Sequence, residues 1–153
     1  MSCRPAKFII PLLLLLLSCA SSEHSKIEDV LKKRDEAFET SNVKLYASII
    51  SPHYEHKRGG KVLRFKDVIN NFKRITVFFD KLKIDHTKRS IYVDDGRARV
   101  VQRTRVEVKM EKEGIKSRFT LIEKLELKKV GNRWFITKEA DRDYAEGFVY
   151  GGS

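Results

Sequence analysis

The sequence has few cysteines, prolines and glycines: its 153 residues include two, three and eight of them, respectively. Two cysteines are too few for a disulfide-stapled miniprotein, and so little glycine and proline excludes a collagen-like chain. Hydrophobic residues make up 41% of the chain and aromatic residues 10%, which is enough to bury a core. The length fits one domain. With 32 lysines and arginines against 21 aspartates and glutamates, that domain is basic.

The first 18 residues have the pattern of an export signal. Arg4 and Lys7 precede an apolar run over residues 8–17, and ten residues are too few to cross a bilayer as a helix. The run ends on Leu-Leu-Ser-Cys at residues 16–19, which resembles the lipobox of bacterial lipoproteins. The resemblance implies that the Cys19 thiol carries a diacylglyceryl group, that the chain is cut before Cys19, and that acyl chains anchor the protein in the bilayer. The alternative is an ordinary small-x-small cleavage site over residues 18–20.

The lipobox divides the chain into four parts. Residues 1–18 are the signal peptide, residues 19–25 are the lipidated cysteine and a short polar tether, residues 26–142 are the folded domain, and residues 143–153 are an aromatic, glycine-rich tail. Removing the signal takes away two basic groups and no acidic ones, so a net charge of +11 becomes +9. We expect the mature protein in the bacterial cell envelope, lipid-anchored at the periplasmic face of the outer membrane.

Three helices are expected in the first half of the domain. The first starts at Ser25, which forms a capping box with Glu28, and runs to about residue 41. Asn42 caps a second, shorter helix that Pro52 stops, and a third helix covers residues 66–79. A Gly-Gly turn between the second and third helices indicates a short hairpin.

The second half alternates apolar and polar residues, and three glycines separate four long strands. In the strand over residues 97–111, the even-numbered residues face the core and the odd-numbered residues face solvent. A four-residue loop at residues 111–114 places Met110 opposite Ile115 and therefore sets the register of the two central strands.

This order of elements is that of an α+β fold, in which N-terminal helices pack in the concave face of a curved antiparallel sheet. The order from Ile27 to Ile136, with the Gly-Gly turn and a closing strand that begins Gly-Asn-Arg-Trp at residues 131–134, resembles the nuclear-transport-factor-2-like (SnoaL-like) superfamily of cone-shaped domains. The resemblance implies a pocket between sheet and helices. Relatives use that pocket for isomerisation, dehydration, cyclisation or epoxide hydrolysis of apolar substrates, or for binding alone, and the fold does not choose among these functions.

Four polar residues are expected on the core-facing side of the sheet: His86, Gln102, Thr104 and Glu123. The strand before Gly96 changes parity after His86 and needs a bulge there, which places His86 opposite Thr104 and one strand from Glu123. These four residues are our candidate ligand pocket. His86 and Glu123 are also candidate catalytic residues, as base and orienter in an apolar cone. We favour a structural role, in which Glu123 accepts hydrogen bonds from Gln102 or Thr104 near the wet mouth of the cone and His86 is a satisfied residue of its wall.

The solvent-facing side of the sheet is basic. This basic surface comprises Arg97, Arg99, Arg103, Arg105, Lys109, Arg118 and Lys124, together with Lys116 and Lys128. For a lipid-anchored protein, the nearest polyanion is the layer of anionic headgroups. We expect no nucleic acid as a partner, because the protein is exported and the surface lacks the aromatic residues on which single strands stack. The alternative is a solvated surface without a dedicated partner.

The sequence predicts no metal site and no cofactor. His53 and His56 are three residues apart on an expected strand, so they point to opposite faces. The sequence contains no glycine-rich phosphate loop, no nucleophile elbow and no thiol cluster.

We therefore predict a membrane-anchored periplasmic lipoprotein, monomeric or homodimeric, that binds a small apolar ligand or an envelope protein without catalysis. The alternative is a lyase or isomerase that uses His86 and Glu123 as an acid/base pair in the cone. The tail at residues 143–153 folds over the mouth of the cone, docks on a partner or stays disordered, and the sequence leaves these three possibilities open.

Overall fold

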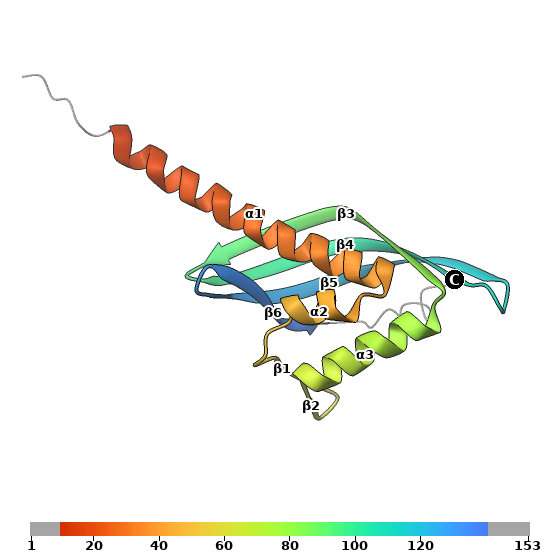
Figure 1. The fold of residues 1–153 in the computed structure, drawn as a ribbon. Coiled ribbons are helices and arrows are strands. Elements are labelled where there is room, and N and C mark those ends of the chain that lie inside the picture. Colours follow the sequence, from red (N-terminus) through yellow and green to blue (C-terminus); the bar gives the residue numbers. More distant parts are fainter. Residues whose placement is uncertain (1–9, 141–153) are drawn as a thin grey trace, which may run out of the picture.

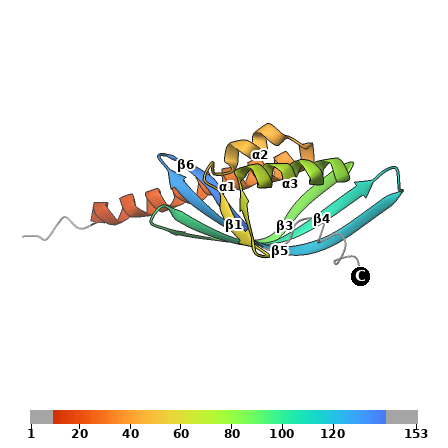
Figure 2. The ribbon, with the colours of Figure 1, turned by 90° about the horizontal axis from the view of Figure 1, so that it is seen from below.

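The computed structural model describes residues 10–140, so the predicted tail at residues 143–153 lies outside the described residues. Three helices and six strands make up this part of the chain: α1 (Ile10–Thr40), α2 (Val43–Ile49), β1 (Glu55–Arg58), β2 (Lys61–Arg64), α3 (Phe65–Phe78), β3 (Lys81–Asp94), β4 (Arg97–Met110), β5 (Ile115–Val130) and β6 (Arg133–Ala140). The helices lie on the concave side of one curved sheet (Figures 1 and 2). The α+β prediction is confirmed. Within the described part of the chain, no helix is both long and apolar enough to span a membrane.

The large sheet is antiparallel throughout, in the order β3-β4-β5-β6. The predicted register of the central pair is confirmed, because Met110 lies opposite Ile115 and Gln102 opposite Glu123. The small hairpin of β1 and β2 turns at Gly59 and Gly60, whose positive φ angles of 53° and 78° suit glycine.

Each outer strand of the large sheet contains one extra residue. In β3, Thr87 stands between His86 and Lys88, which pair with consecutive residues of β4, so the predicted bulge is present. In β6, Thr137 is the corresponding extra residue, opposite the step from Glu126 to Leu127 in β5. Bulges bend and twist the strand that carries them, and the sheet wraps around the helices.

The core lies between the concave face of the sheet and the helices. Alternate residues of β4 and β5, such as Val100, Val106 and Leu121, are at most 2% exposed. They meet an aromatic cluster from the helices, in which the rings of Tyr46 and Phe72 stack at 4.2 Å. Large buried side chains therefore occupy much of the space beneath the sheet.

Helix α1 differs from the prediction at its start. It passes through Ser25 without a break, so the expected capping box is absent, and Glu28 instead accepts a hydrogen bond from Arg89. The residues expected as a polar tether continue the helix, because alanine, serine and glutamate tolerate helical geometry and tertiary contacts hold this turn. Glu23 accepts hydrogen bonds from Trp134 Nε1 at 2.8 Å and lies 3.0 Å from Lys129 Nζ. These contacts fix α1 to the turn between β5 and β6.

The other helix boundaries agree with the sequence. Asn42 caps α2, with its side-chain oxygen accepting a hydrogen bond from the backbone N–H of Leu45 at 3.0 Å. Helix α3 begins one residue before its predicted start, and Asp67 accepts a hydrogen bond from the backbone N–H of Arg64 at 2.8 Å. This contact stabilises the first turn of α3.

Candidate functional site

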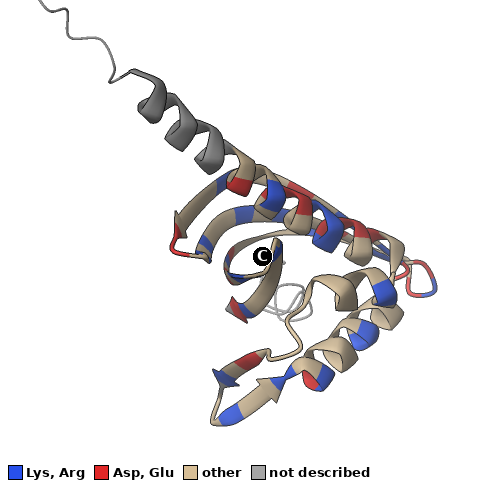
Figure 3. Cartoon of the chain, turned by 60° about the vertical axis from the view of Figure 1, so that its left-hand side comes forward, with Lys and Arg blue, Asp and Glu red and all other residues tan. Residues whose placement is uncertain are grey.

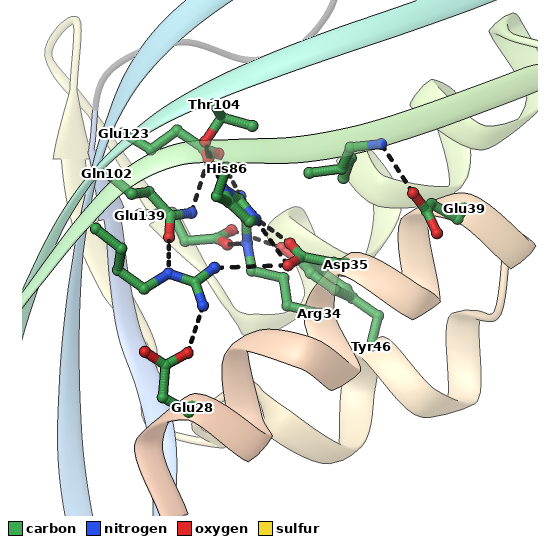
Figure 4. Close-up of polar contacts among 12 residues, drawn as sticks. Glu28, Arg34, Asp35, Glu39, Tyr46, His86, Gln102, Thr104, Glu123 and Glu139 are labelled. Carbon is green, nitrogen blue, oxygen red and sulfur yellow. Dashed lines mark hydrogen bonds and ion pairs between the residues drawn. The ribbon is translucent and has the colours of Figure 1, made fainter. Parts of the chain in front are cut away.

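The four polar residues predicted to face the core come together on adjacent strands. His86 of β3 lies opposite Thr104 of β4, and Gln102 of β4 lies opposite Glu123 of β5. Gln102, Thr104 and Glu123 are at most 5% exposed, whereas His86 is half-buried. Figure 4 shows these side chains directed toward one another and toward α1. We call this cluster, with the α1 residues that bond to it, the polar network.

Arg34 of α1 is the central cation of the polar network. Its side chain is 5% exposed, and its guanidinium lies 2.8 Å from Glu123 Oε1 and 2.6 Å from Glu139 Oε1. The second carboxylate oxygen of Glu139 accepts a hydrogen bond of 2.6 Å from the hydroxyl of Tyr46. Because a buried charge is tolerated only when it is paired, these contacts explain how an arginine fits beneath the sheet.

Glu123 is an ionised carboxylate whose oxygens are fully engaged. It accepts hydrogen bonds from Arg34, from Gln102 Nε2 at 2.9 Å and from the Thr104 hydroxyl. Burial raises the pKa of Glu123, but the charge of Arg34 and these hydrogen bonds outweigh burial and lower the pKa to about 2. A carboxylate with so low a pKa is a poor proton acceptor at neutral pH.

Both ring nitrogens of His86 have a partner within the protein. His86 Nδ1 lies 3.0 Å from the hydroxyl oxygen of Thr104, and His86 Nε2 lies 2.7 Å from Oδ2 of Asp35. The ring is therefore held between β4 and α1 by contacts at both of its nitrogens.

The polar network also fastens α1 to the outer strand β3. Glu28 contacts Arg89 at 2.5 Å, Asp35 contacts His86, and Glu39 accepts a hydrogen bond of 2.8 Å from the backbone N–H of Ile84. Two polar atoms at this seam, Asp35 Oδ1 and Arg89 Nη2, are buried without a hydrogen-bond partner, although each lies near an opposite charge.

Sequence reasoning missed the charged residues that α1 and β6 contribute to the polar network. Arg34, Asp35 and Glu139 are charged, and charged side chains are usually exposed, so a core position was not expected for them. One signal was present: Glu28, Asp35 and Glu39 recur at helical spacing beside the apolar stripe of α1, which places them on one flank of the helix.

Two hollows are open on the described surface, and the polar network lines neither. The first has a volume of about 550 Å³ and lies between the end of α3 and the β4–β5 hairpin, where Val77, Phe78 and Met110 supply its apolar lining. The second, of about 590 Å³, lies across the far ends of the four long strands and is lined by charged residues with Tyr92 and Thr137.

No group of three histidine, cysteine, aspartate or glutamate side chains suited to hold a metal ion occurs among the described residues. His53 is exposed in the loop before β1, and His56 lies within β1.

The basic surface predicted from the sequence lies on the convex side of the sheet. Its nine lysines and arginines between residues 97 and 128 are all exposed. Figure 3 shows lysines and arginines recurring along the strands of the sheet. The molecule therefore presents two charged regions: the polar network inside the cone and the basic surface outside it.

Comparison with known proteins supports the fold. The sequence matches no family model and no curated protein, but solved structures match closely in shape. A nuclear-transport-factor-2-like superfamily protein from Salmonella enterica superposes with a TM-score of 0.68 at 15% identity, over 84% of this chain and 99% of that one. This chain therefore has the nuclear-transport-factor-2-like fold, as the sequence predicted.

Two enzymes are among the similar structures. A proposed scytalone dehydratase from Novosphingobium aromaticivorans has a TM-score of 0.71 at 13% identity, over 80% of this chain and 85% of that one. A hexachlorocyclohexane dehydrochlorinase from Novosphingobium barchaimii has a TM-score of 0.66 at 12% identity, over 80% and 87% of the two chains. Identities this low establish the shared fold and leave the activity of this chain open.

Proposed function

We propose that this protein is an exported, lipid-anchored domain of the bacterial envelope that binds a ligand or partner and does not catalyse a reaction. The anchor rests on the Leu-Leu-Ser-Cys sequence at residues 16–19. Labelling of the producing cells with a fatty-acid analogue tests it. The wild-type chain incorporates the label and Cys19→Ser does not, whereas Cys3→Ser retains it because Cys3 is removed with the signal. Label in the Cys19→Ser variant contradicts the anchor.

The closed polar network carries the non-catalytic part of this proposal. An acid/base pair needs one group that accepts a proton from the substrate. Glu123 is held ionised by three donors, and both nitrogens of His86 are occupied by contacts with Thr104 and Asp35. In this arrangement, the hydrogen bonds of Glu123 and His86 hold the sheet and α1 together.

The hollow beside α3 offers the best site for a small apolar ligand. Val77 is 87% exposed and Phe78 is 49% exposed, and such exposure of large apolar side chains beside a hollow marks a binding site more often than chance. The volume of about 550 Å³ falls within the range of small-molecule sites. Three cations, Lys73, Arg74 and Lys112, and two carboxylates, Asp80 and Glu113, also line the hollow, and this small excess of positive charge favours a ligand that carries an acidic group.

Native mass spectrometry of the chain purified gently from its host envelope tests this site. We expect a stoichiometric small-molecule adduct on the wild-type chain and its loss in Val77→Glu. The matched control is Val130→Glu, since Val130 is also exposed, at 61%, but lies at the end of β5 away from the hollow. A bare wild-type mass, or equal loss in both variants, argues against an apolar ligand here and leaves an envelope protein as the partner.

A second candidate function is a lyase or isomerase, favoured by the contact of His86 with Asp35 and by the fold shared with a proposed dehydratase and a dehydrochlorinase. Dehydration and dehydrochlorination are eliminations, and a base must remove a proton. ¹⁵N NMR of the His86 ring distinguishes the two proposals. We expect both ring nitrogens to be hydrogen-bonded to Thr104 and Asp35 in the folded protein. A ring nitrogen without such a bond, together with turnover that His86→Gln abolishes, favours the enzyme.

A further inference from the structure

We propose that the convex face of the sheet docks on the phosphate headgroups of an anionic lipid bilayer, with the row Lys88, Arg103 and Ile122 at the centre of contact. This inference rests on the proposed envelope location and adds a second membrane contact to the lipid anchor.

Like charges face each other across the strands of the convex face. Lys109 lies directly opposite Lys81 on one side and Lys116 on the other, and Arg103 lies opposite Lys88. Such cross-strand pairs of equal sign destabilise a sheet. The convex face keeps these like-charge pairs beside attractive ones such as Lys83 with Glu107 and Arg99 with Glu126.

Acidic residues lie beside several cations of the convex face: Asp85 is the cross-strand partner of Arg105, and Lys81 contacts Glu111 at 3.2 Å. Glu107 pairs with Arg118 at 2.6 Å, and Glu126 pairs with Lys138 at 3.3 Å. At the centre, Lys88, Arg103 and Lys124 are exposed and form no ion pair with any described residue. A partner that carries closely spaced negative charges would neutralise them.

The centre of the convex face also exposes one apolar side chain. Ile122, at 54% exposed, lies opposite Arg103, which in turn lies opposite Lys88. These three residues occupy the middle of β5, β4 and β3, and the sheet bows away from the helices, so this row protrudes (Figure 2).

An isoleucine among cations fits a lipid interface better than other polyanions. Cationic side chains near a bilayer are attracted to its anionic headgroups, while an apolar side chain gains by entering the boundary between headgroups and acyl chains. Single-stranded nucleic acids stack on several aromatic side chains. The convex face does expose Tyr92, opposite Arg99 near one end of the sheet, contrary to the sequence expectation, but the central row contains no aromatic residue. An acidic protein would pair with the cations but would not require an exposed Ile122 at the centre of the convex face.

Vesicle co-sedimentation of the unlipidated mature chain tests the inference. The chain begins at residue 19 and carries Cys19→Ser, so no acyl chain contributes. It keeps every described side-chain contact, because these lie between Glu23 and Glu139. We expect binding to phosphatidylcholine vesicles that contain phosphatidylglycerol and none to phosphatidylcholine alone. Binding weakens steeply as salt is added, because the attraction is between exposed charges.

Two variants and a control locate the contact. Lys88→Glu lowers the affinity for the anionic vesicles by at least about tenfold, because it reverses a central charge. Ile122→Ala lowers it by a few-fold, on the order of the loss of a partly buried apolar side chain. Lys66→Glu on α3 makes the same charge change on the helical side and leaves the affinity unchanged.

Three results would overturn the inference: no binding to anionic vesicles, equal binding to uncharged vesicles, or equal losses in Lys88→Glu and Lys66→Glu. Unchanged binding in Ile122→Ala overturns the assignment of Ile122 to the contact, because charge alone then accounts for the binding. Because the tested chain has no acyl group, a failed fatty-acid labelling of Cys19 leaves this measurement intact, and the two proposals stand or fall separately.

Discussion

Charged side chains are paired on the concave face of the sheet, whereas several on the convex face are not. On the concave side, Arg34, Arg89 and His86 meet four carboxylates at distances of 2.5–2.8 Å. On the convex side, cations such as Arg103 and Lys124 stand exposed without an acidic partner among the described residues. Burial makes pairing obligatory, because an unpaired charge removed from water is costly. Exposure removes that demand, so the charges of the convex face are free of the constraint that fixes the charges of the concave face.

The largest effect expected inside the cone follows from removing the central cation. Arg34→Ala leaves Glu123 and Glu139 without their main partner, and we expect a loss of about 3–5 kcal/mol in the free energy of unfolding, measured in urea. The double variant Arg34→Met with Glu123→Leu should recover part of that loss, because it removes the buried carboxylate of Glu123 and leaves Glu139, whose side chain is 20% exposed, without its arginine. A loss below about 1 kcal/mol in the single variant would show that the network is not buried as described.

The second-largest effect is expected from acid, which should lower the free energy of unfolding through Glu123. The folded-state pKa of Glu123 is about 2, below its usual value of 4.5, so its ionisation stabilises the fold above pH 4.5 and this stabilisation is lost as the pH falls toward 2. The difference corresponds to about 3 kcal/mol.

Glu123→Gln isolates this contribution. The pKa of Glu23 is also lowered to about 2, by Lys129, Lys26 and Trp134, and Glu23 titrates over the same range. The wild-type protein should therefore lose more stability between pH 5 and pH 2 than the Glu123→Gln variant does. Parallel pH profiles would contradict the assignment.

The smallest change in the free energy of unfolding is expected on the convex face, and it is an increase rather than a loss. Lys88→Glu replaces a repulsive cross-strand pair with an attractive one, so the free energy of unfolding should rise by about 0.2–1 kcal/mol. The same variant is expected to lose vesicle binding, and this opposition of stability and binding separates a functional charge from a structural one. Thermal unfolding at low salt measures the change, and a destabilised Lys88→Glu variant would contradict it.

The sequence predicted the sheet well because its signals are local. Alternation along β4 and β5, a glycine in each turn and the parity change after His86 were sufficient to derive the register and the bulge. The meeting of His86, Gln102, Thr104 and Glu123 followed from that register.

The missing parts of the site depend on distant partners. Arg34 is separated from Glu123 by 89 residues and from Glu139 by 105, and no local pattern shows that an arginine on a helix will lie under a sheet. The start of α1 was predicted too late for a similar reason. The capping signal at Ser25 is local, whereas Glu23 is held by Lys129 and Trp134 from the other end of the chain.

The two bulges of the outer strands share one design. Thr87 in β3 and Thr137 in β6 are the extra residues, and each hydroxyl donates to a carbonyl of the neighbouring strand, of Arg103 at 3.4 Å and of Glu126 at 3.1 Å. Deleting either threonine would leave every remaining cross-strand pair in register, so these residues add length without changing partners. The bend of each outer strand therefore depends on one inserted residue. Evolution or design can change the curvature of the sheet by removing a single codon from β3 or β6, without changing any other strand pairing.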